Sequence, residues 1–582
     1  MDSTYENVNI NYPPQDILLR EWRSNVSPWV VDIDEDFRCA LFERASRILS
    51  PERIEQLLDE NNSAQKVFNV YGTAILLKML NQPVRAKDLL VELTKIVPYA
   101  ALYVDISGIC TQIESLFERA KFLEKAFKKD PQNSVIWNFL GSALMSINKK
   151  ERGIELLRKS AEARPDNQIV HSNFLFFCHH ANELDCQKLF ADHKRWAQFN
   201  VNEELTIKDH TNTPDPNRKL RVGYISPDFR AHPVGLLIKP ILDYHNRDDV
   251  EVFGYGSVSG KDKFTRHLET CFDHYRDIIG IDDTKVVKMI VDDGIDILID
   301  LAGHTGGNRL GVMSLKPAPV QVTYLGYFET TGLDQIDYFL TDSQMSPPES
   351  QQYHTETIFP LPDTCFCYNI PDETPAVVAS PVLQNGYVTF GMFSNPNKIT
   401  PKTAILWAKI MQNAANSRLK LIIKGGQSDE LTSIFLNLLE EAGISRDRID
   451  VRGKMSLGNY FAEYGKVDIM LDTYPYNGGA TTCDALWMGV PVISLVGEHH
   501  FSRVGLSLLS SVGLEYFACK TEDEYVAKAS VLANKPDALA KIRGTLRQRM
   551  KASAMCDMHL QAKSIENAYR EMWRRWCMER RS

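Results

Sequence analysis

The stretch IMLDTYPYNGGATTCDALWMGVPVIS, Ile469–Ser494, predicts an apolar strand, a glycine-bearing loop, a helix ended by Gly489 and a second strand. In an open α/β sheet this order brings backbone N–H groups and a helix N-terminus to the carboxyl end of a strand. We interpret the loop as a cradle for a diphosphate. Its residues are small or turn-favouring, or carry hydroxyl donors: Asn477, Gly478, Gly479, Ala480, Thr481 and Thr482.

Asp484 belongs to the same segment and allows two interpretations. Thr481 and Asp484 fit the Ser/Thr-x-x-Asp/Glu pattern of a capping box, in which the carboxylate only bonds the start of its own helix. On local pattern alone, the interpretation of Asp484 as a ligand-binding carboxylate is about as probable as the capping box. The position of the loop between a strand that ends at Asp472 and a helix favours the ligand role. The loop is not a Walker A motif, because no Gly-Lys-Ser/Thr follows.

Composition narrows the class of protein. The chain has 582 residues, of which 44% are hydrophobic, which suggests roughly three to four globular domains. A net charge of -9 argues against a sequence-blind nucleic-acid binder, which needs a basic face. The N-terminus lacks a secretory pattern and no apolar run is long enough to span a bilayer, so we expect a cytoplasmic protein. Eleven cysteines without paired spacing indicate neither disulfides nor a zinc site.

Helical patterning dominates the N-terminal third. Residues 1–66 form a predicted helical arm whose acidic run VDIDED, residues 31–36, we interpret as solvated charge. Residues 67–218 are predicted to form tetratricopeptide-like repeats and a linker, because Pro98, Pro131 and Pro165 are spaced 33 and 34 residues apart. Two repeats, starting at Ala100 and Ser134, fit best. Such arrays more often bind a partner protein than catalyse a reaction, and a helical spacer is the alternative.

From about Lys219 strands alternate with helices, which predicts doubly wound α/β domains at residues 219–375 and 376–555. Segment 361–385 is the predicted hinge, and residues 556–582 form a final helix. Two such domains place a cleft between facing carboxyl ends of strands. His499 and His500 lack the spacing of zinc ligands and are interpreted as loop residues.

Three further loops follow predicted strands and carry polar side chains. In SNPNKITP, Lys398 could neutralise a diphosphate leaving group in place of a metal, although most lysines are solvated surface residues. In DFRAHPVG, His232 could act as a general base or orient an acceptor hydroxyl. In DLAGHTGGNR, Asp300 and His304 end another strand and could line the same cleft. One such histidine is more often structural, but two at strand ends of one sheet favour a function.

Six ordered motifs resemble those of the tetratricopeptide-containing protein O-GlcNAc transferases and their plant SPINDLY relatives. The resemblance covers about Leu220 to Trp576 and implies a GT-B fold, in which two Rossmann-like domains follow the helical repeats. It also implies metal-independent, inverting transfer of a sugar from a nucleotide diphosphate to Ser or Thr of a protein. The motifs are RVGYISPDFRAHPVG, DLAGHTGGNR, LKPAPVQVTYLGY, NPNKITP, DTYPYNGGATTCDALWMGVPV and FSRVGLSLL.

By this resemblance, His232 falls on the active-site histidine of the family and Lys398 on the lysine that contacts the donor diphosphate. Thr481 and Asp484 fall on the donor-loop threonine and the ribose-binding aspartate. The chain also departs from the family pattern. Asn395 replaces a glutamine, Gly479 and Ala480 replace a His-Thr pair, Phe328 and Glu329 interrupt a GYPGT sequence, Leu457 replaces a lysine, and Tyr460 stands where a ring-bearing residue is expected at the base pocket.

The resemblance implies UDP-GlcNAc as donor, with no cofactor and no metal. The departures leave GDP-fucose, as in SPINDLY, or UDP-glucose, as in bacterial N-glucosyltransferases, as alternative donors. A non-catalytic scaffold is the alternative from another class, against which the intact lysine, aspartate and glycine positions argue. Expected partners are acceptor proteins or peptides bound by the repeats and the cleft, and a second copy of the chain could join them. The proton acceptor stays open among His232, His304, Asp300, water and a donor phosphate oxygen.

Overall fold

The computed structural model describes residues 70–580, apart from residues 76, 79–80, 97, 182–183, 372–373, 424–428 and 454. The predicted N-terminal arm and its acidic run therefore lie outside the described residues. The chain divides into two compact units, residues 1–143 and 144–582. The boundary between them in the sequence falls within the helix Ser134–Ser146. No helix among the described residues is both long enough and apolar enough to cross a bilayer.

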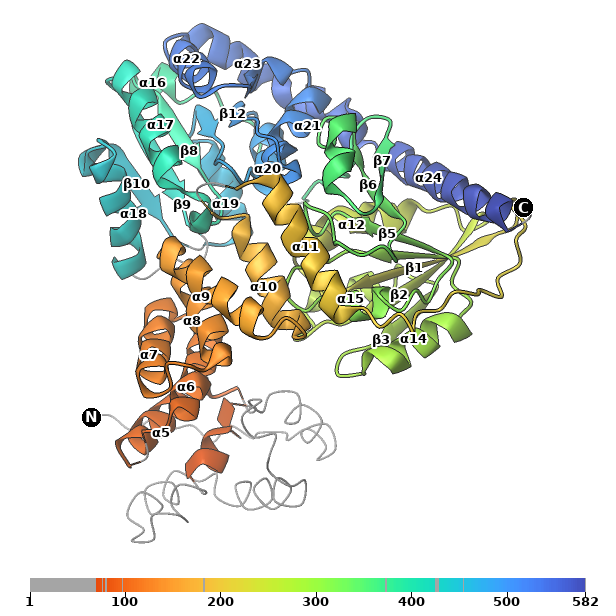
Figure 1. Cartoon of the computed structure of the whole chain (residues 1–582). Coiled ribbons are helices and arrows are strands. Elements are labelled where there is room, and N and C mark those ends of the chain that lie inside the picture. Colours follow the sequence, from red (N-terminus) through yellow and green to blue (C-terminus); the bar gives the residue numbers. More distant parts are fainter. Residues whose placement is uncertain are drawn as a thin grey trace, which may run out of the picture. The chain divides into compact units, whose positions relative to one another are not determined.

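The first unit is helical where it is described (Figure 1). It holds α5 (Pro83–Ile96), α6 (Ala100–Gln112), α7 (Leu116–Lys129) and the start of α8 (Ser134–Ser146). Helix α6 packs against both α5 and α7. Their apolar faces meet in a core in which Leu93, Ile106 and Leu123 are fully buried. Helices α6 and α8 begin at Ala100 and Ser134, the positions at which the sequence predicts the two repeats to begin.

The helices that follow share a core with the first α/β domain. They are α9 (Lys150–Ala163), α10 (Gln168–Cys178) and α11 (Cys186–Asn200). Leu157, Phe174 and Trp196 from these helices belong to the same buried cluster as Ile225 and Leu298 of the sheet. Burial of shared apolar surface therefore ties α9–α11 to the α/β half as one compact unit.

The first sheet has seven parallel strands in the order β3-β2-β1-β4-β5-β6-β7. The order reverses between β1 and β4, which creates a crevice at their carboxyl ends. The strands are β1 (Leu220–Ser226), β2 (Val250–Gly256), β3 (His274–Asp277), β4 (Ile297–Asp300), β5 (Val320–Tyr324), β6 (Tyr338–Asp342) and β7 (Thr357–Leu361). The accompanying helices are α12 (Pro233–Tyr244), α13 (Lys263–Glu269), α14 (Asp283–Asp292), α15 (Leu310–Met313) and the 3-10 helix η2 (Pro348–Tyr353).

The second sheet has six parallel strands in the order β10-β9-β8-β11-β12-β13, and its order reverses between β8 and β11. The strands are β8 (Thr389–Met392), β9 (Arg418–Ile422), β10 (Ile449–Arg452), β11 (Ile469–Leu471), β12 (Val492–Leu495) and β13 (Ala518–Cys519). The α-helices are α16 (Val382–Asn385), α17 (Pro401–Asn413), α18 (Asp429–Glu441), α19 (Leu457–Tyr464), α20 (Ala480–Trp487), α21 (Val504–Ser511), α22 (Glu522–Ala533) and α23 (Pro536–Lys551). Short 3-10 helices are η3 (Pro396–Lys398), η4 (Arg446–Arg448), η5 (His500–Ser502), η6 (Glu515–Phe517) and η7 (Ala554–Cys556).

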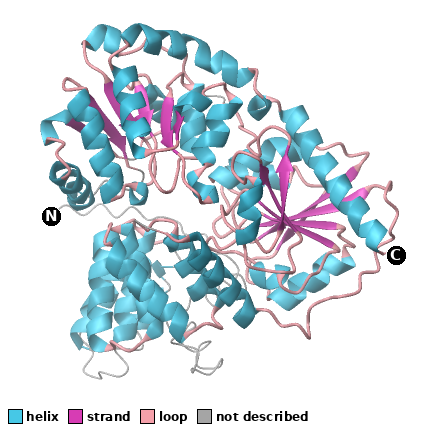
Figure 2. Cartoon of the chain, turned by 45° about the horizontal axis from the view of Figure 1, so that its top comes forward, coloured by secondary structure: helices cyan, strands magenta, loops and turns pink. Residues whose placement is uncertain are grey.

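Figure 2 shows the two groups of strands as separate sheets, each flanked by helices. The last helix, α24 (Met558–Glu579), returns to the first α/β domain and packs against α12, β5 and β7. There Glu566 pairs with the buried His245 at 2.8 Å, and Trp573 Nε1 donates to Asp215 O. The C-terminal helix thus closes the first domain after the second domain is complete.

The predicted fold class, a helical region followed by two parallel-sheet α/β domains, is confirmed. The apolar runs that predict strands in residues 219–375 and 376–555 cover ten of the thirteen strands of the two sheets, and the other three are β3, β7 and β13. All three lie at sheet edges, where half-exposed backbone tolerates polar residues, as in HYRD, or a proline, as at Pro360. His499 is a loop residue, as interpreted, whereas His500 begins the 3-10 helix η5, and both are at least nine-tenths buried.

Candidate functional site

A cavity of about 500 Å³ lies among the loops that follow the central strands of both sheets. The loops after β1 and β4 line it from one domain, and the loops after β8 and β11 line it from the other. The switch point of each sheet therefore opens onto the same space. Of the residues singled out from the sequence, the cavity lining includes His232, Asn395, Lys398, Gly479, Ala480, Thr481 and Asp484.

Lys398 ends the 3-10 helix η3 and reaches across to the loop after β11. Its Nζ donates to Asn477 O at 2.6 Å and lies 3.8 Å from the ring centroid of Tyr476. One donor is therefore used by the protein, and the ammonium has two more. Burial lowers the pKa of Lys398 to about 8, although the nearby Asp472 opposes this shift. The side chain is thus a confined positive charge beside the cavity.

The N-terminus of α20 adds backbone donors to the same wall. The helix begins at Ala480, with Gly479 as N-cap and no side-chain cap, so Thr481 is not the capping residue that a capping box would need. The first helical hydrogen bond runs from Thr482 N to Gly479 O. The preceding amides of Ala480 and Thr481 point out of the helix at its positive end, which favours an anion. Gly489 ends the helix with φ of +77°, as the sequence predicts.

Asp472, at the end of β11, holds this loop in shape. One carboxylate oxygen accepts from Gly478 N at 2.7 Å and Thr473 N at 2.9 Å, and the other accepts from Ser494 Oγ at 2.6 Å. Burial raises the pKa of Asp472 to about 6, while these hydrogen bonds oppose the shift. Gly478 and Asn477 thus stabilise the loop conformation. The Asn477 side-chain amide donates to Thr473 O, and the backbone carbonyl of Asn477 accepts from Lys398 Nζ.

Asp484 lies one turn into α20 and is held between two tyrosines. Tyr368 Oη donates to Oδ1 at 2.8 Å, and Tyr460 Oη donates to Oδ2 at 3.2 Å. Tyr460 also bonds Tyr464 at 2.7 Å and is itself buried. It therefore holds the carboxylate in place without lining the cavity. The oxygens of an ionised carboxylate only accept hydrogen bonds, so Asp484 suits hydroxyl donors of a ligand. The tyrosines therefore fix the orientation in which Asp484 meets the cavity.

His232 is the N-cap of α12, and 35% of its side chain is exposed. Its Nδ1 accepts weakly from Val234 N at 3.4 Å and lies 3.6 Å from Asp228 Oδ1. The two contacts favour opposite tautomers, since the amide needs a lone pair on Nδ1 and the carboxylate favours a proton there. No described residue is hydrogen-bonded to Nε2. Burial lowers the pKa of His232, while Asp228 opposes the shift, so a neutral imidazole is available at the cavity.

Asp300 and His304 do not line this cavity. His304 is fully enclosed, with Nδ1 bonded to Ser172 Oγ at 2.9 Å and Nε2 bonded to Thr331 O at 2.8 Å. Asp300 accepts from the amides of Ala302 and Gly303, and burial raises its pKa to about 6. Both residues shape the loop after β4. Thr482, whose hydroxyl bonds Gly478 O, is likewise buried, in the first turn of α20.

Several residues of the site have no clear signal in the sequence. Tyr368 lies in the predicted hinge, far along the chain from Asp484. Tyr476 lies in the glycine-bearing loop, where the small residues indicate a diphosphate site but nothing indicates a role for the tyrosine ring. Phe176, near the end of α10, and His180, two residues after that helix, also line the cavity. Only the unusual aromatic run FLFFCHH, residues 174–180, hints that this helix end packs against something specific.

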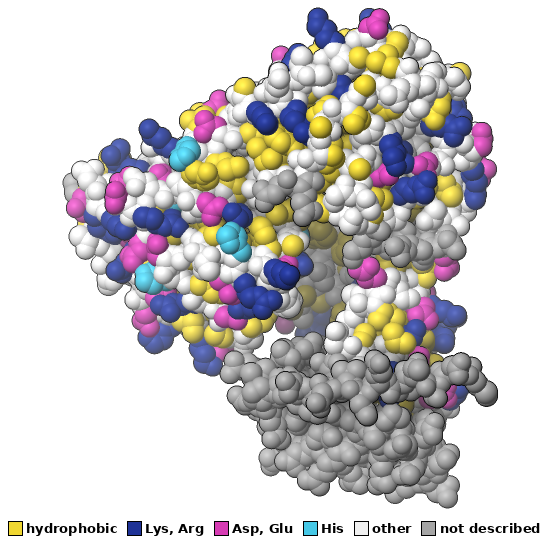
Figure 3. Space-filling model, turned by 180° about the vertical axis from the view of Figure 1, so that it is seen from behind, with side chains coloured by type: hydrophobic (Ala, Val, Ile, Leu, Met, Phe, Trp, Pro, Cys, Tyr) yellow, Lys and Arg dark blue, Asp and Glu magenta, His cyan; other side chains and the backbone are white. Residues whose placement is uncertain are grey.

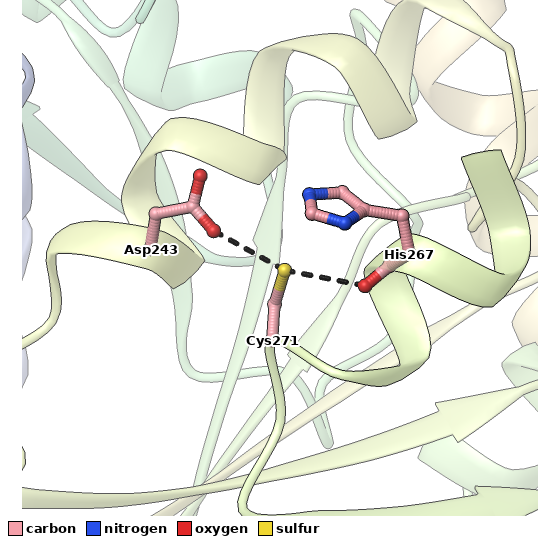
Figure 4. A group of neighbouring side chains, drawn as sticks. All are labelled: Asp243, His267 and Cys271. Atoms are coloured by element: carbon pink, nitrogen blue, oxygen red, sulfur yellow. Dashed lines mark hydrogen bonds between the residues drawn. The ribbon is translucent and has the colours of Figure 1, made fainter.

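One group of three potential metal ligands occurs among the described residues, and it lies away from the cavity. Figure 4 shows Cys271 between Asp243 and His267, with Sγ 3.2 Å from Asp243 Oδ1. Asp243 is eleven residues after His232 on α12, about 16 Å along the helix. Its carboxylate also pairs with Lys239, and burial together with Asp243 raises the pKa of Cys271 to about 12. Asp243 and Cys271 therefore already have protein partners, and the thiol of Cys271 stays protonated.

The described surface carries charges of both signs. On the face that Figure 3 shows, Lys and Arg side chains are interspersed with Asp and Glu side chains. Such a mixture differs from the single-sign stripe by which proteins hold nucleic-acid backbones.

Comparison with known proteins gives one consistent result. The model of "Glycosyl transferase family 41" matches residues 198–372 and 379–565. The "Probable UDP-N-acetylglucosamine--peptide N-acetylglucosaminyltransferase SPINDLY" of Petunia hybrida is 40% identical over 418 residues, 71% of this chain and 45% of its own. The protein of the same description named SEC, from Arabidopsis thaliana, is 30% identical over 371 residues, 62% of this chain and 38% of its own.

Among solved structures, a mutant of the Thermobaculum terrenum O-GlcNAc transferase aligns with a TM-score of 0.84 and 31% identity. The alignment covers 89% of this chain and 99% of that chain. It confirms the GT-B arrangement of the two α/β domains. The chain spans less than half the length of the curated relatives named above.

Proposed function

Because the chain belongs to glycosyl transferase family 41, we propose that it transfers GlcNAc from UDP-GlcNAc to Ser or Thr of protein acceptors, with inversion and without a metal ion. The observation that carries this proposal is the shared cavity, in which Lys398 and the N-terminus of α20 meet Asp484. A confined cation and backbone donors suit a diphosphate, and a fixed carboxylate suits a ribose. The named relatives support the donor and the acceptor.

In the proposed reaction the acceptor hydroxyl attacks the anomeric carbon, and the bond from that carbon to the β-phosphate oxygen breaks. The electron pair and the growing negative charge go to the nucleoside diphosphate, where Lys398 and the α20 amides stabilise them. The hydroxyl proton goes to a base, for which His232 Nε2 is our candidate, because it lines the cavity without a protein partner among the described residues.

The same proposal extends to the acceptor proteins and to the cellular location. We infer that acceptor peptides enter the cleft and that the helical repeats recruit the proteins that carry them. A cytoplasmic location fits a nucleotide-sugar donor. Self-association remains a prediction from the sequence alone.

The decisive experiment is a donor panel. Purified protein, treated with EDTA, is incubated with UDP-GlcNAc, GDP-fucose or UDP-glucose and a cell lysate, and modified proteins are read by mass spectrometry. We expect HexNAc on Ser or Thr with the first donor. Deoxyhexose or hexose addition would instead establish one of the other donors. No product and no affinity for UDP or GDP would support a scaffold, and activity only with added Mg²⁺ or Mn²⁺ would overturn the metal-free mechanism.

Removal of the ribose-binding carboxylate should weaken donor binding more than turnover. We expect Asp484→Ala to raise the Kd for UDP by about 10- to 100-fold, the effect of losing hydrogen bonds to a charged group. Asp484→Asn keeps the shape and one acceptor oxygen, so it should lie between wild type and Asp484→Ala. Calorimetric titration with UDP measures both. An unchanged Kd in both variants would contradict the assignment.

The lowered pKa of Lys398 predicts a pH dependence of donor binding. The free protein loses the positive charge as the pH rises through about 8, so UDP should bind about tenfold more weakly at pH 9.5 than at pH 7. A Lys398→Arg variant keeps its charge throughout this range and should show a flatter profile, whatever its absolute affinity. Parallel profiles for the two proteins would exclude Lys398 as the titrating group.

A further inference from the structure

The end of α10 brings a histidine of the helical region to the wall of the cavity. His180 lines the cavity together with Phe176, and only 3% of the residue is exposed. Its Nδ1 is buried and has no hydrogen-bond partner among the described residues. The ring meets Tyr476 edge-on with centroids 5.2 Å apart, and it lies 5.6 Å from the ring of Phe176. The imidazole is therefore held in place by aromatic neighbours.

Two other histidines nearby provide a comparison. His171 on α10 and His179 after it also have a buried nitrogen without a partner among the described residues. His179 is stacked on Tyr327 and Phe501, with centroids 4.8 and 4.5 Å away. Of the three, only His180 is part of the cavity lining. His180 is therefore the one of the three whose side chain borders a space that a ligand can enter, and buried polar groups in proteins generally have a partner when the site is complete.

The charge state of His180 indicates which part of a ligand it suits. Burial holds its pKa well below the usual value, and the cations Lys150 and Lys398 lower it further. A neutral imidazole offers one donor and one acceptor. Sugar hydroxyls also both donate and accept, whereas diphosphate oxygens at neutral pH mainly accept. The pair of groups on the imidazole thus matches a sugar better than a phosphate.

We propose that His180 hydrogen-bonds the sugar of the bound donor, so that the helical region builds part of the sugar subsite. This inference rests on the proposed function. A donor whose ribose meets Asp484 and whose diphosphate meets Lys398 must direct its sugar further along the cavity. Tyr476 connects the two regions, because Lys398 Nζ lies over its ring and His180 meets its edge.

The test compares UDP with UDP-GlcNAc, and GDP with GDP-fucose, by calorimetric titration of the full chain. We expect His180→Leu to leave the Kd for the free nucleotide within twofold of wild type and to raise the Kd for the nucleotide sugar about tenfold. His180→Gln retains a donor and an acceptor and should recover most of this loss. His171→Leu, on the helix that immediately precedes His180 but outside the cavity lining, is the matched control and should change neither Kd.

Thermal unfolding of each variant shows whether it is folded. If His180→Leu does not fold, His180→Asn replaces it, since the shorter side chain withdraws its polar atoms from the cavity and predicts the same tenfold loss. Equal effects on nucleotide and nucleotide sugar, or no effect on either, would overturn the proposed contact. Failure of the wild-type protein to bind any of the four probes would instead overturn the proposed function, and this contact with it.

Discussion

Lys398→Ala is expected to reduce sugar transfer by at least about a thousandfold while the protein stays folded. The loss follows from the removal of a full positive charge at the departing diphosphate, where even one neutral donor contributes about 10²- to 10³-fold. The fold should persist because Nζ makes one hydrogen bond, to Asn477 O, and one ring contact, to Tyr476, within the described residues. Initial rates with the donor identified by the panel, together with thermal unfolding, measure both effects.

The matched control is Lys402→Ala. Lys402 lies on the next helix, pairs with the exposed Glu522 at 2.6 Å and is not part of the cavity lining. It should keep wild-type transfer, because an exposed ion pair contributes little. Near wild-type turnover by Lys398→Ala would remove the main support for a metal-free mechanism, since no other lysine lines the cavity within the described residues and the lining arginine, Arg230, pairs with Asp228 at 3.1 Å.

The second large effect concerns stability and involves Glu329, one of the departures from the family pattern. Its carboxylate lies 3.2 Å from His499 Nδ1, and the pair joins the first α/β domain to the second. Both side chains are at least nine-tenths buried. The pKa of Glu329 is lowered to about 2, because His499 outweighs the effect of burial. Contacts with Cys186 and Glu329 raise the pKa of His499 to about 10 against burial.

Glu329→Gln should therefore lower the free energy of unfolding by about 3 kcal/mol at pH 5.5, near the lower end for breaking a buried ion pair. The pH dependence has a defined sign. The contribution of Glu329 is present above its unfolded pKa of 4.5 and is lost as the pH falls toward 2. The contribution of His499 is present below 6.5 and is lost as the pH rises toward 10. The difference between variant and wild type should shrink at pH 9.5.

Urea unfolding at pH 5.5 and pH 9.5 measures this difference. Glu441→Gln, at an exposed position on α18, removes the same charge and should change stability by less than about 0.5 kcal/mol. A Glu329→Gln protein as stable as wild type at pH 5.5 would show that the pair contributes nothing net, as some buried ion pairs do.

The four loops of the site differ in how far the sequence predicted them. The loop after β11 was predictable because strand, small residues and helix follow one another within one segment. Four predicted residues of this segment line the cavity: Gly479, Ala480, Thr481 and Asp484. Lys398 and His232 also follow central strands, so local order places them at the cavity. Asp300 and His304 carry the same pattern after β4, yet their polar atoms are used by Ser172, Thr331 and neighbouring amides. Nothing in the local sequence distinguishes a satisfied histidine from an available one.

The sequence by itself determined the repeat period, the two doubly wound domains and the loops at their switch points, because these depend on residue order over short stretches. The tertiary structure alone decided which polar groups remain available and which distant residues join them. Tyr368 reaches Asp484 across 116 positions, and His180 reaches the cavity from a helix that precedes both sheets. Such partners are set by the packing of shared apolar cores, which brings segments together without leaving a local pattern in the chain.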